Sequence, residues 1–399
     1  MLLRETIENE IRERGPIPFG RYMEICLYHP SHGYYARNAE QFGKAGDFYT
    51  ASDVHAVFGR LLARQFDEIW RALDRPSAIE ILELGPGRGL FAGDVLDWSQ
   101  KKFPEFFAAL TYTLQESSPA LRRKLQENLR GHIDRGKAQV PPDPARPGMS
   151  PADPGIHRAL APEIPLMVFA NEFFDALPVE ILSTQGQLHI AMVNNRLQEI
   201  WLPPLARELE FLDCYGVGPE AGERIEVPMA AQAWIPKIAA SGTMKTGLLL
   251  IIDYGYTRDE QRAGRHRGTL MAYRRHSASP DPYQAPGEQD LTAHVNFTAL
   301  ASGCEQAGLR CERLLTQSQF LMGIGEKNQF ADVFEDCRVP QERAKAALQL
   351  KHLVTPAGMG ENFQVLISSR GLSALQTATL CGLSFGTGAW LPGVGSRSE

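Results

Sequence analysis

The sequence lacks the cysteine spacing of a metal or redox centre. It contains six cysteines, and no two of them form a CxxC pair. Zinc ribbons and thioredoxin-like centres need closely spaced cysteine pairs, so we expect no metal site. The cysteines are instead expected to be reduced thiols in a reducing compartment.

Long apolar runs and an excess of positive charge are also missing. No apolar run approaches the roughly 20 residues that cross a bilayer, and the net charge is −6. Nucleic acid is not expected as the main partner, because phosphate binding needs a basic face. The first residues, MLLRETIENEIRERG, indicate a charged amphipathic helix without an apolar signal core, and their acids disfavour a transit peptide. These features predict a cytoplasmic protein with no integral membrane segment.

One stretch of the chain, residues 79–90, reads IEILELGPGRGL. It starts as a short apolar run, the form that a buried parallel strand takes in sequence. Glycines follow at alternate positions, where the backbone can turn sharply and lie close to a ligand. A helix is expected next, with Phe91, Val95 and Trp98 on its inner face. A strand, a glycine loop and a helix together predict a nucleotide-binding turn.

The motifs of two common nucleotide sites are absent from this turn. A dinucleotide motif that begins at Gly85 needs Gly or Ala at its sixth position, where this chain has Leu90, and the Walker Lys-Ser/Thr pair is missing. The pattern Glu83-x-Gly85-x-Gly87-x-Gly89 resembles instead the first motif of S-adenosylmethionine (SAM) methyltransferases. The resemblance implies that the turn lies against the methionine part of the cofactor. Glu83, Gly85 and Gly87 are therefore predicted to bind SAM.

A second acid follows the next predicted strand. The segment TYTLQES, residues 111–117, alternates in polarity and has Glu116 near its end. An acid at this place can accept both ribose hydroxyls of a nucleotide, although an ordinary surface carboxylate is the alternative. Ser118 and Pro119 then predict the start of a helix. Residues 134–165 are rich in proline and glycine and indicate an exposed loop, which leaves the place of a third strand open.

Residues 165–178, PLMVFANEFFDALP, carry the candidate chemistry. A buried strand over 166–170 is followed at once by polar, acidic and aromatic residues, and ligands of doubly wound folds bind at such carboxyl ends. We call residues 171–175 the NEFFD loop. It resembles in position the Asn/Asp-Pro-Pro-aromatic loop of N-methyltransferases but lacks the prolines. The predicted catalytic residues are Asn171, Glu172 and Asp175, and the predicted substrate contacts are Phe173 and Phe174.

The segment before the turn has two candidate roles. The aromatic-rich stretch IPFGRYMEICLYHPSHGYYARN is interpreted either as a helix and loop packed on the main domain or as a lid over a small-molecule pocket. Asp47 and Phe48 lie just ahead of a helix capped by Ser52 and ending near Trp70. They are predicted cofactor contacts, although a loop Asp is more often a turn former.

Several motifs in order resemble one family. GPIPFGRYMEICLYHPSHGYY, GDFYTASDVHAVFG, LELGPGRG, ANEFFDALPVE, IIDYGY, DLTAHVNF and MGENFQVL resemble the MidA-like family over about residues 1–370. The family includes the mitochondrial complex I assembly methyltransferase, which dimethylates an arginine of a complex I core subunit symmetrically. The resemblance implies a class I methyltransferase fold, SAM as cofactor and a protein arginine acceptor. Two departures are Asn296, where an Asp is expected, and Ser52 to Val54, where mitochondrial relatives tend to have Pro-Glu.

The second half supplies the rest of an α/β, doubly wound Rossmann-like sheet. A strand meander with turns at Thr184–Gln187 and Asn194–Asn195 begins a region expected to wall a substrate groove or to form a homodimer surface. The apolar strand from Leu248 is expected to end in Asp253, Tyr254 and Gly255. Either Tyr254 and Tyr256 line a cleft, or Asp253 caps a simple strand-end turn. A helix is expected from Asp290 or Thr292, with His294 as a substrate contact, and a last strand from Phe363 to Ser369. The predicted domains are a helical lid segment (1–78), a SAM-binding half (79–178), an inserted subdomain (179–240), the remaining sheet (241–370) and a disordered tail (371–399).

These features predict a SAM-dependent methyltransferase that acts on a nitrogen. The resemblance implies that its protein substrate is a respiratory-complex (NADH dehydrogenase-type) subunit. An arginine acceptor is already cationic, so carboxylates must hold its charge and orient one nitrogen. Glu172 and Asp175 are the candidates, with Phe173 and Phe174 as walls that exclude water. The alternatives are a small-molecule N- or O-methyltransferase and a SAM-binding assembly chaperone without turnover.

Overall fold

The computed structural model describes residues 2–36, 56–141, 155–240, 242–274 and 277–385. Asp47 and Phe48, the predicted cofactor contacts of the N-terminal segment, lie outside the described residues, as does Ser52.

The main sheet has eight strands in the order β15-β16-β10-β5-β2-β3-β4, with β14 paired to β10. The strand β16 runs antiparallel to both of its neighbours, and the other strands along this order pair in parallel. The apolar run 79–84 is buried along its whole length, as expected for an inner strand. The strands are β2 (Ile79–Leu84), β3 (Leu110–Gln115), β4 (Ala138–Gln139), β5 (Leu166–Asn171), β10 (Gly247–Tyr256), β14 (Val295–Asn296), β15 (Arg310–Thr316) and β16 (Phe363–Arg370).

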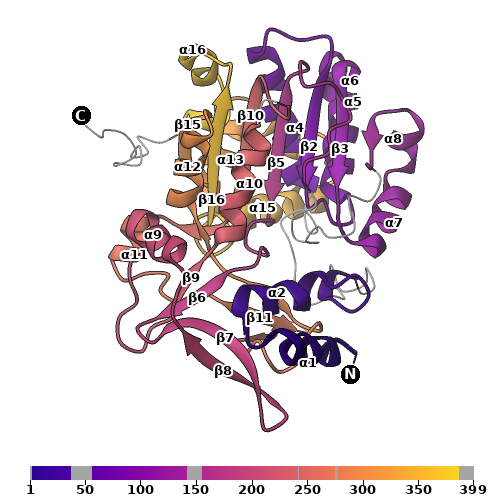
Figure 1. Cartoon of the computed structure of the whole chain (residues 1–399). Coiled ribbons are helices and arrows are strands. Elements are labelled where there is room, and N and C mark those ends of the chain that lie inside the picture. The colour runs from indigo at the N-terminus through magenta and orange to yellow at the C-terminus, as the bar shows by residue number, and fades with distance from the viewer. Residues whose placement is uncertain (1, 37–55, 142–154, 241, 275–276, 386–399) are drawn as a thin grey trace.

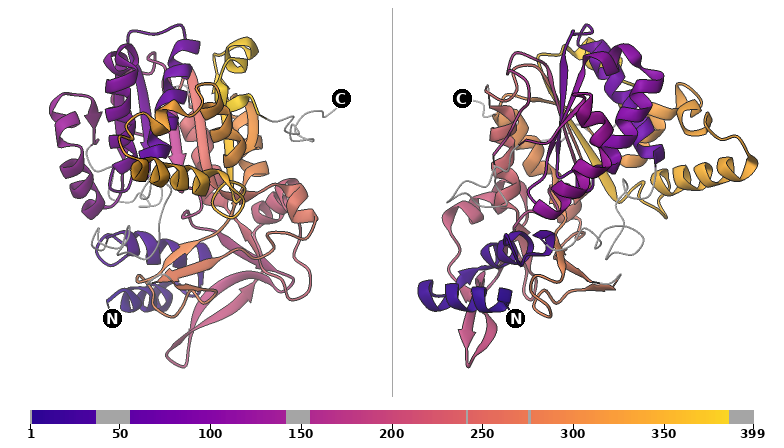
Figure 2. Two further views of the ribbon diagram at one scale, coloured as in Figure 1. Left: turned by 180° about the vertical axis from the view of Figure 1, so that it is seen from behind. Right: turned by 90° about the vertical axis from the view of Figure 1, so that its right-hand side faces the viewer.

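Helices cover both faces of this sheet (Figures 1 and 2). Ile79 and Ile81 of β2 pack into the core under one set of helices, whereas Leu82 and Leu84 pack into the core on the other face. The predicted inner face of the helix after the glycine turn is confirmed, because Phe91, Val95 and Trp98 are buried. The first face carries α4 (Ala56–Ala72), α5 (Leu90–Lys102), α13 (Gln317–Glu326) and α15 (Pro340–Val354), and the second carries α10 (Met229–Ala239) and α12 (Phe297–Gln306). The doubly wound α/β fold is therefore confirmed.

Short helices complete the edges of this domain. Ser118 caps α7 through a hydrogen bond accepted from the N–H of Leu121, as its place before Pro119 predicts. The proline- and glycine-rich segment supplies the edge strand β4, whose two residues are too few for a periodic signal. These helices are α6 (Pro104–Ala109), α7 (Pro119–Asn128), α8 (Arg130–Asp134) and α14 (Ala331–Phe334).

A second layer lies beside the carboxyl ends of the main strands (Figure 1). Its five-stranded sheet joins the N-terminal strand β1 to strands of the 179–240 region. The predicted turn at Asn194 and Asn195 is present, with both residues at positive φ. Apolar residues of the first two helices share a core with this sheet, so the N-terminal segment and the insertion form one structural unit. The elements are α1 (Leu2–Arg14), β1 (Ile17–Pro18), α2 (Phe19–Tyr28), η1 (Tyr34–Ala36), β6 (Glu180–Ser183), β7 (Gly186–Val193), β8 (Arg196–Leu202), α9 (Ala206–Tyr215), β9 (Ile225–Val227) and α11 (Arg258–Arg262).

The helix predicted from Asp290 or Thr292 begins later than expected. Asp290–Thr292 forms β13 in a three-stranded sheet with β11 (Met271–Arg274) and β12 (Ser277–Ser279). The helix α12 starts at Phe297, and the side chain of Asn296 caps it by accepting from the N–H of Ala299 at 2.9 Å. The prediction was wrong because Asp and Thr are good caps only where a helix follows, and here β11 pairs with them first. Asn caps as well as the expected Asp does.

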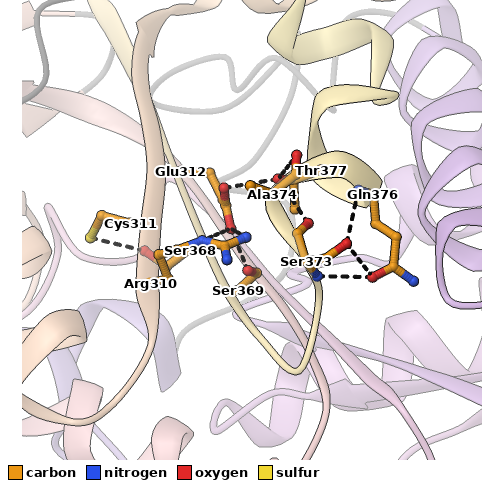
Figure 3. A network of polar contacts seen from close by, with 9 residues as sticks. All are labelled: Arg310, Cys311, Glu312, Ser368, Ser369, Ser373, Ala374, Gln376 and Thr377. Atoms are coloured by element: carbon orange, nitrogen blue, oxygen red, sulfur yellow. Dashed lines mark hydrogen bonds and ion pairs between the residues drawn. The ribbon is translucent and has the colours of Figure 1, made fainter.

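The predicted disorder after residue 370 is wrong for residues 371–385. They form α16 (Ala374–Ala378) and η3 (Cys381–Leu383). Glu312 of β15 accepts hydrogen bonds from Ser369 and Thr377 and so ties α16 to the sheet (Figure 3). The side chain of Gln376 donates to the carbonyl of Ala72 at 2.7 Å. These tertiary contacts outweigh the flexible composition of the segment.

No helix among the described residues is both long and apolar enough to span a membrane.

Candidate active site

A cavity of about 650 Å³ opens at the carboxyl ends of the central strands. Its lining comes from five segments: the glycine turn, the NEFFD loop, the end of β10, the N-terminal segment and the 265–294 region. This is the place where doubly wound sheets bind their ligands.

The glycine turn has the left-handed backbone that its sequence predicts. Gly85, Gly87 and Gly89 have φ values of 67°, 56° and 72°. A Cβ atom at Gly85 would lie 2.9 Å from Cδ2 of Phe173, so there is also no room for a side chain at this position. Gly85 and Gly87 line the cavity, and their contact with the cofactor stays a prediction.

Glu116 lies beside this turn and lines the cavity. Its Oε2 accepts from the N–H of Gly87 at 3.1 Å, and its Oε1 accepts from the N–H of Ser118 at 2.8 Å. Burial raises the pKa of the Glu116 carboxyl to about 7, against the effect of these backbone donors. The carboxylate is thus held between the glycine turn and the start of α7, where it can accept ribose hydroxyls.

Glu83 has a different place from the one predicted. It is buried, accepts from the Tyr112 hydroxyl at 2.9 Å, and is not among the residues that line the cavity. Burial raises the pKa of its carboxyl to about 8. A direct cofactor contact does not fit this placement, because the Glu83 side chain is directed toward Tyr112 of β3 and away from the cavity. Glu83 supports the turn from behind.

The NEFFD loop brings most of its predicted residues to the cavity. Asn171, Glu172, Phe173 and Asp175 line it, whereas Phe174 is buried and does not. Glu172 has φ of 49°, a strained conformation for a residue with a side chain, and such strain is concentrated at functional sites. The Asn171 amide donates to Oε1 of Glu172 at 3.2 Å.

Asp253 orders this loop from the end of β10. Its Oδ2 accepts from the backbone N–H groups of Phe173, Phe174 and Asp175, and its Oδ1 accepts from the N–H of Tyr254 at 2.9 Å. Burial and the nearby Glu172 raise the pKa of the Asp253 carboxyl to about 8. The sequence left a strand-end turn and a cleft wall open. β10 continues through Asp253 to Tyr256, so there is no turn at Asp253; Tyr254 lines the cavity, whereas Tyr256 is buried and does not.

Residues that the sequence did not assign to the site form another wall. Tyr28, Tyr35 and Asp290 line the cavity together with Asp175. The Tyr35 hydroxyl donates to Oδ1 of Asp290 at 2.9 Å, and the Tyr28 hydroxyl donates to the carbonyl of Ala176 at 3.0 Å. The aromatic composition of the N-terminal stretch was the available signal. α2 shares a core with the second sheet and not with the main sheet, whereas Tyr28 and Tyr35 line the cavity. The lid stays a prediction.

His294, the predicted substrate contact, also lines the cavity. Its Nδ1 lies 3.0 Å from Nδ1 of His266. Burial and the neighbouring His266 lower the pKa of His294 to about 4, so the ring is neutral near pH 7. Among the described residues, no group of three His, Cys, Asp or Glu side chains is placed to hold a metal ion.

The family model of S-adenosyl-L-methionine-dependent methyltransferases matches residues 61–315. The chain belongs to this family. The enzyme is thus a SAM-dependent methyltransferase, as its glycine turn and its likeness to the MidA-like family predict. The match covers the strand, the glycine turn and the NEFFD loop, all of which contribute to the cavity.

Two curated relatives cover almost the whole methyltransferase. The mitochondrial protein arginine methyltransferase NDUFAF7 of Danio rerio is 30% identical over 402 residues, which are 94% of this chain and 87% of the relative. The mitochondrial NDUFAF7 homolog of Drosophila melanogaster, also named a protein arginine methyltransferase, is 28% identical over 93% of this chain and 86% of its own.

A solved structure extends the likeness to three dimensions. A Burkholderia thailandensis protein crystallised with S-adenosyl-homocysteine superposes with a TM-score of 0.78 at 28% identity, covering 96% of this chain and 95% of the other. The residues of this methyltransferase fit the cofactor. Gly85 and Gly87 leave room for the methionine part at the turn, and Glu116 offers a carboxylate to the ribose.

Proposed function

We propose that this methyltransferase transfers the methyl group of SAM to a guanidinium nitrogen of an arginine in a protein substrate. The observation that carries the proposal is the acidic end of the cavity. Glu172, Asp175 and Asp290 line it, and Asp253 lies directly behind the NEFFD loop. The names of the two curated relatives support the same acceptor.

The chemistry of these acids favours a cationic ligand. The four hydrogen bonds described for Asp253 come from neutral backbone N–H groups, and Asp290 accepts from a neutral tyrosine hydroxyl. Burial, together with Asp253 and Asp290, raises the pKa of the Asp175 carboxyl. Buried carboxylates that lie close together repel one another, and a cation offsets this cost. A guanidinium that enters the cavity brings a positive charge to these acids.

Each residue has a defined task in the transfer. SAM supplies an electrophilic methyl group when it is bound. Glu172 and Asp175 pair with the guanidinium and hold one nitrogen in line with that methyl, and Glu172 accepts the proton which this nitrogen gives up. Asn171 fixes the Glu172 carboxylate through its amide. Positioning of this kind can supply roughly 7–11 kcal/mol of barrier reduction.

The substrate class that we propose is a subunit of a respiratory, NADH dehydrogenase-type complex, because the resemblance to the complex I assembly methyltransferase implies it. Purified enzyme and methyl-labelled SAM are added to lysate from a strain that lacks the protein, and labelled products are identified by mass spectrometry. A dimethyl- or monomethylarginine in one protein is the expected product. Label on a small molecule, or on another residue type, contradicts the proposal.

The same experiment distinguishes arginine methylation from the remaining alternative, an assembly chaperone. An assembly chaperone that holds SAM without turnover would capture a stable partner and leave no label in the lysate. A heat-treated enzyme and the Glu172→Gln variant are the matched controls. The cytoplasmic location and the homodimer stay proposals, which cell fractionation and sedimentation of the purified enzyme test.

A further inference from the structure

Four residues from distant parts of the chain form a recess at the acidic end of the cavity. We call Tyr28, Tyr35, Asp175 and Asp290 the tyrosine–aspartate recess. The two acids come from the NEFFD loop and from β13, and the N–H of Ala293 joins these segments by donating to the carbonyl of Asp175 at 2.9 Å. The Ser118 hydroxyl donates to the carbonyl of Tyr35, so the recess adjoins the segment that holds Glu116.

The recess contains a buried polar atom that a ligand can satisfy. Asp175 is only 6% exposed, and its Oδ1 has no hydrogen-bond partner among the described residues. Buried polar groups are usually paired, so this acceptor oxygen indicates a ligand that donates a hydrogen bond.

The tyrosines give the recess flat aromatic walls. The ring centroids of Tyr28 and Tyr35 lie 5.4 Å apart at 44°. Both hydroxyls are engaged by the carbonyl of Ala176 and by Asp290, so these side chains are fixed and offer mainly aromatic surface to a ligand. Aromatic surface next to carboxylates suits a planar, weakly hydrated cation.

We propose that the tyrosine–aspartate recess selects a guanidinium over an ammonium acceptor, with Asp175 and Asp290 each accepting hydrogen bonds from it. This proposal rests on the proposed function and assigns its specificity. A guanidinium presents five N–H donors in one plane and can reach acids on two separate elements. An ammonium is a compact, strongly hydrated point charge, which loses more hydration in the recess and cannot lie flat against an aromatic ring.

Calorimetric binding of two small probes to the S-adenosyl-homocysteine complex tests the recess. The probes are Nα-acetyl-arginine-methylamide and Nα-acetyl-lysine-methylamide. The wild-type enzyme is expected to bind the arginine probe at least about tenfold more tightly, because a site built for one set of hydrogen bonds rejects a ligand that lacks them. Asp290→Asn should remove this preference, and Tyr35→Phe, which releases Asp290 from its hydroxyl partner, should reduce it several-fold.

A matched variant controls for loss of charge and for folding. Glu288 lies two residues before Asp290, pairs with Arg274 at 2.6 Å and does not line the cavity. Glu288→Gln should keep the wild-type preference, and all variants should keep the wild-type affinity for S-adenosyl-homocysteine. That affinity also reports whether each variant is folded.

The outcomes separate this proposal from the proposed function. The role of the recess is contradicted by equal affinity for both probes, by no binding of either probe, or by an unchanged preference in Asp290→Asn. Arginine methylation in lysate is measured independently of these outcomes. Label on a residue other than arginine overturns the proposed function, whatever the probes show.

Discussion

Oδ2 of Asp253 lies 2.9 Å from the backbone nitrogen of Phe174 and accepts its hydrogen bond. The same oxygen accepts from Phe173 at 3.2 Å and from Asp175 at 3.3 Å, so one carboxylate of β10 holds the last three residues of the NEFFD loop. The strands β10 and β5 pair in parallel, which brings the carboxylate and the loop to the same edge of the sheet. The geometry of the acceptor site therefore depends on a residue that does not itself line the cavity.

Asp253→Asn is expected to loosen this loop and to destabilise the protein. Both carboxylate oxygens accept from backbone N–H groups, so an amide must turn its NH₂ toward at least one donor. Hydrogen bonds to charged groups contribute about 1.5–3 kcal/mol each, and we expect a loss of that order. Thermal unfolding measures it. Asp259→Asn, on the exposed surface of α11, is the control, and an unchanged melting temperature in Asp253→Asn would show that the clamp contributes little.

Gly85→Val should abolish SAM binding. The new Cβ would approach Phe173 to 2.9 Å, and the φ of +67° disfavours any side chain. In differential scanning fluorimetry, the melting temperature of the variant should no longer rise with SAM. Gly131→Ala is the control, since a Cβ there meets nothing within 4 Å. A normal SAM response in Gly85→Val would mean that the turn does not hold the cofactor.

Glu116→Gln and Glu83→Gln should differ in their effect on cofactor affinity. Glu116 lines the cavity, whereas Glu83 lies behind the turn. Only Glu116→Gln should therefore lower the affinity for S-adenosyl-homocysteine by tenfold or more, because a hydrogen bond to a charged group contributes about 1.5–3 kcal/mol. Equilibrium dialysis measures both. A large loss in Glu83→Gln with normal folding would restore the direct contact that its motif predicts.

The affinity of the wild-type enzyme for S-adenosyl-homocysteine should fall as the pH falls through 7. Burial raises the pKa of Glu116 to about 7 in the ligand-free protein, and the ionised form is the one that accepts both ribose hydroxyls. One unit below this pKa only about a tenth of the carboxyl is ionised, so binding should weaken about tenfold at pH 6. Glu116→Gln should flatten the profile; a wild-type profile that is already flat would contradict the role of Glu116.

Glu172→Gln should stop methyl transfer and leave cofactor binding unchanged. Glutamine keeps the shape but neither neutralises a guanidinium nor accepts its proton, and losing one such electrostatic contact typically costs about 10²–10³ in kcat. Single-turnover transfer of labelled methyl to the identified substrate measures the rate. Wild-type transfer by this variant would remove Glu172 from the chemistry.

Much of the fold could be predicted from local patterns. The apolar runs at 79–84 and 166–170 are buried strands, and the glycines after the first have the expected positive φ, because burial on both faces and sharp turns leave clear signals in composition. Errors arose where tertiary contacts outweighed a local preference. Asp290 lies in a strand and not at a helix cap, and residues 371–385 are held by Glu312 and by the carbonyl of Ala72.

The sequence by itself determined the cofactor end of this methyltransferase. Gly85, Gly87 and Glu116 follow strands that are adjacent in the chain, so their motif places them together. The acceptor end was decided only by the tertiary structure. Tyr35 and Asp290 are hydrogen-bonded across 255 positions of sequence, and Asp253 reaches a loop 79 positions before it. Pairings of this kind arise from strand order and shared burial, which no local pattern encodes, and they turn the NEFFD loop into an acidic site.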